Sequence, residues 1–218
     1  MEWKEWVRQL LYPPRCPFCG RVLEIWEEEG MCHHCQKTLP WCSGEGKRVE
    51  FCCACLSPLY YQNGVRRGMH RYKFWGGQDY AQVFSRLMAQ CLEDGWGEPM
   101  DCITWVPLSP NKLRRRGYDQ SQLLAQQVGA LTGLEVVSTL DKVRNTRQQS
   151  RIIAPSARRA NVAGAYQLRE DADVAGKYIV LVDDVATSGA TLEECAACLR
   201  MGGAEEVVAL TLAQTKKK

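Results

Sequence analysis

Apolar and polar residues follow two different periods along most of this chain. Continuous apolar runs predict strands that are buried on both faces, at residues 102–106, 178–183 and 207–212. Apolar residues at helical spacing predict helices, at residues 77–94, 119–131 and 191–201. Shorter elements are expected as strands at 135–140 and 165–168, a helix at 155–161 and a polar loop at 141–155. This order predicts an α/β fold with a mostly parallel sheet and helices on both faces.

Polar groups follow three of the predicted strands. These strands end near Val106, Leu140 and Val182. Ligands of parallel sheets bind at the carboxyl ends of the strands. We therefore expect the three loops to converge on one site.

Composition divides the chain near residue 59. The 218 residues fit one α/β domain with a small appendage, and eight of the twelve cysteines precede residue 56. We expect an N-terminal domain at 1–58 and an α/β domain at 59–218. The net charge of +3 is too small to indicate nucleic-acid binding by itself. No run approaches the ~20 apolar residues of a membrane span, and no signal peptide is evident, so a cytoplasmic protein is expected.

The cysteines of the first segment include two CxxC pairs, Cys16 with Cys19 and Cys32 with Cys35. This spacing is typical of a structural zinc ribbon, in which four thiolates surround one ion. A redox dithiol is the alternative, although two paired CxxC units argue against it. The remaining cysteines of this segment lack a regular partner pattern and are interpreted as structural or free thiols: Cys42, Cys52, Cys53 and Cys55.

The segment 178–191 is the most informative part of the chain. An apolar strand runs into two acids, Asp183 and Asp184, and then into a turn of small and hydroxyl residues that begins a helix. Backbone N–H groups at a helix N-terminus suit a phosphate, whereas carboxylates suit the hydroxyl groups of a sugar. The alternative is a strand end that merely solvates two acids. A Walker A loop is excluded because no Gly-Lys-Ser/Thr follows. The order predicts a sugar-phosphate site.

This segment resembles the phosphoribosyl pyrophosphate signature of type I phosphoribosyltransferases. The resemblance implies a type I phosphoribosyltransferase-like domain that binds phosphoribosyl pyrophosphate with Mg²⁺. It also implies that Asp183 and Asp184 are the catalytic residues that hold the ribose hydroxyls. The 5′-phosphate would then lie on the turn formed by Ala186, Thr187, Ser188, Gly189, Ala190 and Thr191.

Basic residues in three other places are candidate contacts for the pyrophosphate or for a lid. By the resemblance, the turn after the strand 102–106 faces pyrophosphate, and a long loop closes over it. The candidates are Lys73, Arg114, Arg115, Arg116, Arg144 and Arg147. The alternatives are a solvated charge run for Arg114 and Arg115, an ordinary surface loop for Arg144 and Arg147, and a surface lysine for Lys73.

The combination of a four-cysteine ribbon with such a domain is similar to the ComF family. The resemblance rests on the four cysteines, the VDDVATSGAT segment and three shorter pieces at residues 72–74, 116–120 and 159–162. It implies a role in the uptake of single-stranded DNA during natural transformation, with DNA-uptake proteins as partners.

Two hypotheses about function follow. One is an enzyme that transfers phosphoribosyl to an unknown acceptor. The other is a non-catalytic ligand sensor that binds single-stranded DNA. In the second case aromatic residues near the ribbon could stack bases, although packing on the domain is the simpler interpretation.

Overall fold

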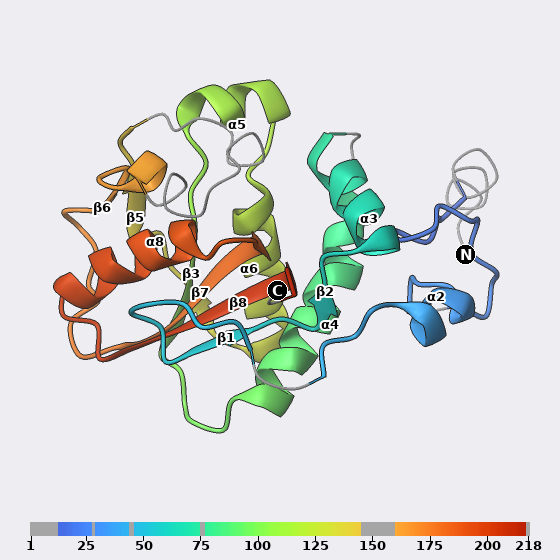
Figure 1. Ribbon diagram of the computed structural model, residues 1–218, viewed down its shortest axis with the longest axis horizontal. Coiled ribbons are helices and arrows are strands. Elements are labelled where there is room, and N and C mark those ends of the chain that lie inside the picture. The colour runs from blue at the N-terminus through green and yellow to red at the C-terminus, as the bar shows by residue number, and fades with distance from the viewer. Residues whose placement is uncertain (1–12, 28, 44–45, 75–76, 145–159, 217–218) are drawn as a thin grey trace.

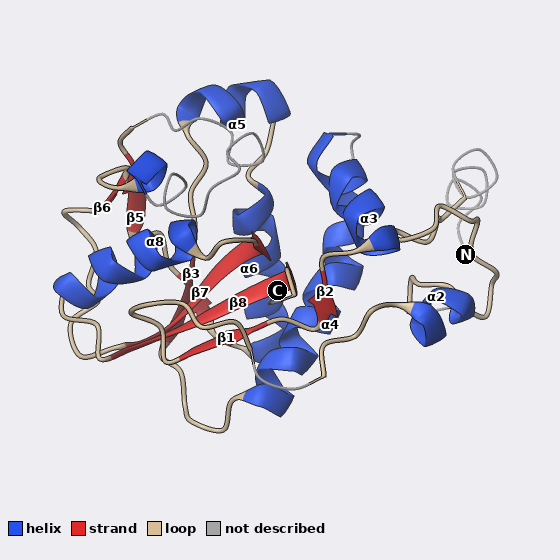
Figure 2. Cartoon of the chain, in the orientation of Figure 1, coloured by secondary structure: helices blue, strands red, loops and turns tan. Residues whose placement is uncertain are grey.

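The computed structural model describes residues 13–27, 29–43, 46–74, 77–144 and 160–216. Within these residues, six strands form one sheet around which the other elements are arranged (Figures 1 and 2). Every pairing in it is parallel. Its order is β1 (Ala54–Leu56), β8 (Glu206–Gln214), β7 (Tyr178–Ala186), β3 (Cys102–Trp105) and β4 (Glu135–Val136), and β2 (Leu59–Tyr60) also pairs with β8.

Helices cover both faces of the sheet because its central strands are apolar on both sides. In β7, Val180 and Val182 face a cluster that includes α4 (Tyr80–Gly95) and α6 (Gln120–Thr132). The alternate residues Ile179 and Leu181 face α8 (Ala190–Met201). The predicted α/β fold is confirmed. None of the described helices is long and apolar enough to cross a membrane.

One predicted strand is wrong as a single element. Residues 135–140 divide between β4, which joins the main sheet, and β5 (Leu140–Lys142), which pairs antiparallel with β6 (Tyr166–Leu168). The Thr139 hydroxyl shares a 2.7 Å hydrogen bond with that of Thr104 in β3. From there the chain turns out of the main sheet, so Leu140 packs in the cluster under α8.

Three of the described helices lie where none was predicted, and two of them bear on the site. α3 (Asn63–Phe74) buries Val65, Gly68, Met69 and Tyr72, so Lys73 lies in its last turn rather than in a loop before a helix. α5 (Pro110–Arg116) carries the basic run after β3, with Pro110 at its start. Short helices at α2 (His33–Thr38) and η1 (Gly77–Asp79) complete the order.

The cysteine-rich segment packs closely against α3. A Cβ atom placed on Gly68 would lie 2.8 Å from the carbonyl oxygen of Pro17. Arg71 donates a 2.7 Å hydrogen bond to the same oxygen, and the buried Phe18 ring lies 5.6 Å from that of Phe84 in α4. The pairing of β1 with β8 also brings residues before 59 into the main sheet. The division at residue 59 stays a prediction.

Candidate functional site

A cavity of about 560 Å³ opens at the carboxyl ends of β3 and β7. Its walls come from α3, from the turn after β3 with α5, from β5, and from the turn between β7 and α8. The loops after Val106, Leu140 and Val182 therefore meet, as the sequence predicts. This volume lies within the ~300–1,000 Å³ that is usual for small-molecule sites.

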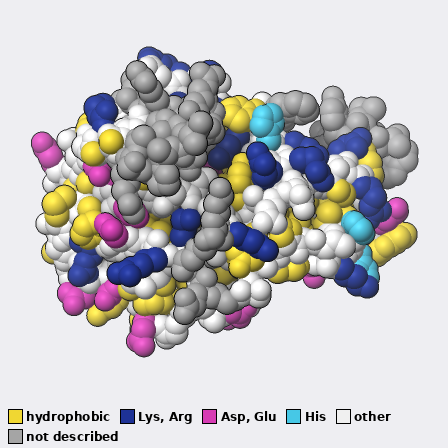
Figure 3. Space-filling view, viewed as in Figure 1, with side chains coloured by type: hydrophobic (Ala, Val, Ile, Leu, Met, Phe, Trp, Pro, Cys, Tyr) yellow, Lys and Arg dark blue, Asp and Glu magenta, His cyan; other side chains and the backbone are white. Residues whose placement is uncertain are grey.

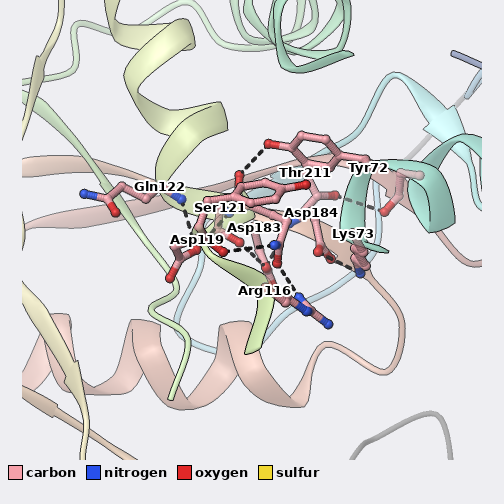
Figure 4. Close-up of polar contacts among 12 residues, drawn as sticks. Tyr72, Lys73, Arg116, Asp119, Ser121, Gln122, Asp183, Asp184 and Thr211 are labelled. Carbon is pink, nitrogen blue, oxygen red and sulfur yellow. Dashed lines mark hydrogen bonds and ion pairs between the residues drawn. The ribbon is translucent and has the colours of Figure 1, made fainter. Parts of the chain in front are cut away.

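The two carboxylates lie side by side in this cavity (Figure 4). Oδ1 of Asp183 accepts a 2.9 Å hydrogen bond from the Ser121 hydroxyl and a 2.8 Å hydrogen bond from the backbone N–H of Asp184. Oδ2 of Asp184 forms a 2.7 Å ion pair with Nζ of Lys73, which reaches across from α3. Both acids are thus held in fixed positions, and each keeps a second oxygen for a ligand.

Burial perturbs the charged groups of the cavity. It raises the pKa of Asp183, and the neighbouring Asp184 carboxylate raises that pKa further. Burial also lowers the pKa of Lys142 to about 8, and burial together with Arg116 lowers the pKa of Lys112. A cluster of shifted pKa values in a cavity is characteristic of functional sites.

The turn after β7 presents backbone to the same cavity. Gly189 adopts φ 90°, a left-handed conformation that favours glycine, and it caps the N-terminus of α8. Four of the six turn candidates line the cavity, namely Ala186, Thr187, Gly189 and Thr191. Ser188 and Ala190 do not, and the Ser188 hydroxyl accepts a 3.4 Å hydrogen bond from the Ala190 N–H. The N-terminus of a twelve-residue helix, with threonine residues on the same cavity wall, suits a phosphate.

The basic residues of α5 divide between the cavity and the surface. The candidate Arg116 lines the cavity, and so does Lys112, which was not among the candidates and lies one turn before it. The Arg116 guanidinium donates to Gln120 Oε1 and lies 4.9 Å from the centre of the Phe74 ring. Arg114 and Arg115 are exposed and do not line the cavity.

The second basic loop shows only its first candidate. Arg144 donates hydrogen bonds to the carbonyl oxygens of Asn161 and Ala163, and it does not line the cavity. Arg147 lies outside the described residues.

Several residues of the site were missed from the sequence. Lys142 points into the cavity from β5 and donates a 2.6 Å hydrogen bond to the Tyr166 hydroxyl. Asp119 caps α6, and its Oδ2 accepts a 2.7 Å hydrogen bond from the Leu108 N–H, which fixes the turn after β3. The alternation of side chains along a strand would place Lys142 on the same face as Leu140, which is the signal that could have found it.

Helix α3 supplies further basic residues to the cavity wall. Arg66, Arg67 and His70 line it together with Lys73. The spacing of Val65, Met69 and Tyr72 is the helical signal that could have placed them on the opposite face.

The four cysteines Cys16, Cys19, Cys32 and Cys35 form one cluster. Their Sγ atoms all lie within 4.8 Å of one another, and Cys19 Sγ is 3.7 Å from Cys32 Sγ. Thiolates on a tetrahedral zinc ion, with Zn–S bonds near 2.3 Å, stand roughly 3.8 Å apart. The donor set therefore fits a tetrahedral metal ion. Cys52, Cys53 and Cys55 lie at β1, far along the chain from this cluster.

The raised pKa of Asp183 predicts a pH-dependent cost to folding. In the folded protein the carboxyl group of Asp183 keeps its proton at pH values above its usual pKa of 3.8. The free energy of unfolding therefore falls as the pH rises from that value through the pKa of the folded state. Asp183→Asn keeps an oxygen that accepts the Ser121 and backbone hydrogen bonds but carries no charge. We expect it to raise the free energy of unfolding at pH 7 by on the order of 1 kcal/mol, with little change at pH 4.

Urea unfolding at the two pH values measures this difference. Asp79→Asn, at an exposed acid without a capping hydrogen bond, is the matched control. A lower free energy of unfolding for Asp183→Asn at pH 7 would show that burial of the charged carboxylate does not destabilise the fold.

Known proteins resemble this chain over most of its length. The phosphoribosyl transferase domain family matches residues 113–218. The DNA utilization protein YhgH of Salmonella typhi is 32% identical over 206 residues, which cover 92% of this chain and 84% of that protein. Competence protein F of Haemophilus influenzae is 28% identical over 223 residues, which cover 92% and 96% of the two chains.

A solved structure of the glutamine phosphoribosylpyrophosphate amidotransferase from B. subtilis is 21% identical with a TM-score of 0.44, and the match covers 64% of this chain and 29% of that one. From the coverage and identity of the relatives, the chain belongs to the ComF family, with a phosphoribosyl transferase domain and a four-cysteine cluster near its N-terminus.

Proposed function

We propose that this protein binds phosphoribosyl pyrophosphate with Mg²⁺ and transfers its phosphoribosyl group to an acceptor. The observation that carries the proposal is the pair of adjacent carboxylates beside a helix N-terminus in one cavity. Carboxylates accept hydrogen bonds from a sugar diol, and the helix N-terminus binds the phosphate that the same sugar carries. The names of the relatives support a role in DNA utilization and competence.

Each part of the donor has a binding group in this assignment. Asp183 and Asp184 hold the ribose hydroxyls, and the turn 186–191 holds the 5′-phosphate. Lys112, Arg116 and Lys142 are assigned to the pyrophosphate, because these three cations line the cavity whereas the exposed Arg114 and Arg115 do not. Arg116 Nε is shielded from solvent and has no partner among the described residues, so a phosphate oxygen would satisfy it.

Transfer exchanges one bond at C1 of the ribose for another. The C1–O bond to pyrophosphate breaks, and its electron pair leaves with the pyrophosphate. A lone pair of the acceptor forms the new bond to C1, and the proton that the acceptor loses passes to a base or to water. The cations of the cavity stabilise the charge that develops on the leaving group. Bound Mg²⁺, an ion that prefers oxygen ligands, would neutralise further charge on the pyrophosphate.

Lys73 has a distinct role in this scheme. It pairs with Asp184 at 2.7 Å and balances one of the two acidic charges. Lys73 also lines the cavity from α3 and stays a proposed contact for the pyrophosphate.

A ligand sensor that binds single-stranded nucleic acid is the second candidate. The observation that favours it is an exposed tryptophan, Trp26, which lies between the two cysteine pairs and exposes 76% of its surface. An exposed aromatic ring can stack on an unpaired base. Binding of phosphoribosyl pyrophosphate without release of pyrophosphate would distinguish this function from transfer.

We expect the double variant Asp183→Asn, Asp184→Asn to lose binding of phosphoribosyl pyrophosphate. The variant removes both charged acceptors of the diol and both carboxylate oxygens available to Mg²⁺, so the affinity should fall by at least about 100-fold. Isothermal titration calorimetry with Mg²⁺ measures the change, and Asp79→Asn serves as the control. An unchanged affinity of the double variant would refute the assignment of the site.

We also propose that the four-cysteine cluster holds one structural zinc ion. Metal analysis of the purified protein should return one zinc per chain, and Cys35→Ser should lose the metal together with a large part of the thermal stability. Cys53→Ser, at an exposed thiol outside the cluster, should keep both. A protein that contains no zinc, or a Cys35→Ser variant that retains it, would overturn the ligand set.

A further inference from the structure

Helix α3 has two faces with different surroundings. One face is buried, and there Gly68 and Arg71 contact Pro17 of the cysteine-rich segment. The other face lines the cavity with Arg66, Arg67, His70 and Lys73. The cysteine-rich segment thus fixes the rotation of the helix, and the basic face is held toward the cavity.

This basic face carries cations beyond those assigned to the proposed donor. The sequence of α3 contains three Arg, one Lys and one His and no acid. Lys73 pairs with Asp184, but Arg66 and Arg67 form no ion pair with the described residues, and Arg66 lies 5.8 Å from the centre of the Tyr61 ring. Figure 3 shows Lys and Arg side chains gathered over this helix beside a histidine. Uncompensated guanidinium groups in a cavity wall favour an anion.

The two arginines are displaced from the proposed donor groups. Arg66 precedes Lys73 by seven residues, which is about 10 Å along a helix. Lys73 already contacts the carboxylate assigned to the ribose, so the arginines lie further along the wall. The cations assigned to the pyrophosphate, on α5 and β5, line other walls of the cavity. We therefore expect the arginines of α3 to contact a ligand group other than the ribose and the pyrophosphate.

We propose that Arg66 and Arg67, on the basic face of α3, bind a phosphate or carboxylate group of the acceptor, so that the acceptor is a compact organic anion. This inference rests on the proposed transfer function and names the class of its second substrate. Arg side chains hold either group through paired hydrogen bonds. The rings of Tyr61 and Phe74, which also line the cavity, suit a planar acceptor.

The cavity favours a compact anion over a nucleic-acid strand. The volume of about 560 Å³ is that of a small-molecule site.

The test uses the full chain saturated with ribose 5-phosphate, which fills the proposed donor position without reacting. Phenyl phosphate, benzoate and the neutral benzamide are then titrated by calorimetry. We expect one or both anions to bind and benzamide not to bind. Arg66→Gln with Arg67→Gln should weaken the anion by at least about tenfold and change ribose 5-phosphate by less than about twofold. Arg86→Gln, at an exposed arginine of α4 outside the cavity, is the matched control. Comparison of the two anions identifies the group that is recognised.

Four results would overturn the proposal: equal binding of benzamide, no effect of the double variant, an equal loss of ribose 5-phosphate affinity, and binding of an oligothymidylate in place of the small anions. If the wild-type protein binds neither ribose 5-phosphate nor phosphoribosyl pyrophosphate, the proposed donor function fails. The same titrations of the unliganded protein then still test the anion site, because loss of anion binding in the double variant supports it and retention refutes it.

Discussion

Two neighbouring carboxylates at the end of β7 set the main constraint on this structure. Asp183 and Asp184 are half-buried in the cavity, where the negative charge of one carboxylate raises the free-energy cost of ionising the other. The Ser121 hydroxyl, a backbone N–H and the Lys73 ammonium offset part of this cost. These partners come from α6, β7 and α3. The two carboxylates are therefore stabilised only when all three elements are correctly placed. The arrangement is typical of a site where stability is reduced in favour of binding.

The position of α3 connects the cysteine cluster to the cavity. Gly68 allows the helix to approach Pro17 closely, and Arg71 donates a hydrogen bond to the same carbonyl oxygen. Lys73, on the next turn, then reaches Asp184. A metal ion that orders the cysteine turns would thus act on the cavity wall through one helix. Contacts through α3 therefore connect the cysteine-rich segment to the cavity, although residues 16–35 and 183–191 are far apart in sequence.

The sequence predicts the parts of this site that are local. The run from 178 to 191 contains the strand, both acids and the turn that begins α8 in one contiguous stretch, and the CxxC spacing indicates the four-cysteine cluster. Helix α3 was missed because its glycines and basic residues mask a buried face of only a few apolar positions. Gly68 is explained by contact with Pro17, a tertiary cause that no local pattern contains. Likewise, Lys112 and Arg116 face the cavity while Arg114 and Arg115 do not, a difference that depends on the helical rotation of α5.

The central claim is that the two carboxylates hold the ribose diol, and the comparison of ribose 5-phosphate with 2-deoxyribose 5-phosphate tests it most directly. The two sugars share the phosphate and differ in the 2-hydroxyl, which would donate a hydrogen bond to a carboxylate. A hydrogen bond to a charged group is worth about 1.5–3 kcal/mol, so ribose 5-phosphate should bind at least about tenfold more tightly in calorimetric titrations. Equal affinities would contradict the account, because the 2-hydroxyl would then contribute nothing to binding, whereas the account has Asp183 or Asp184 accept its hydrogen bond.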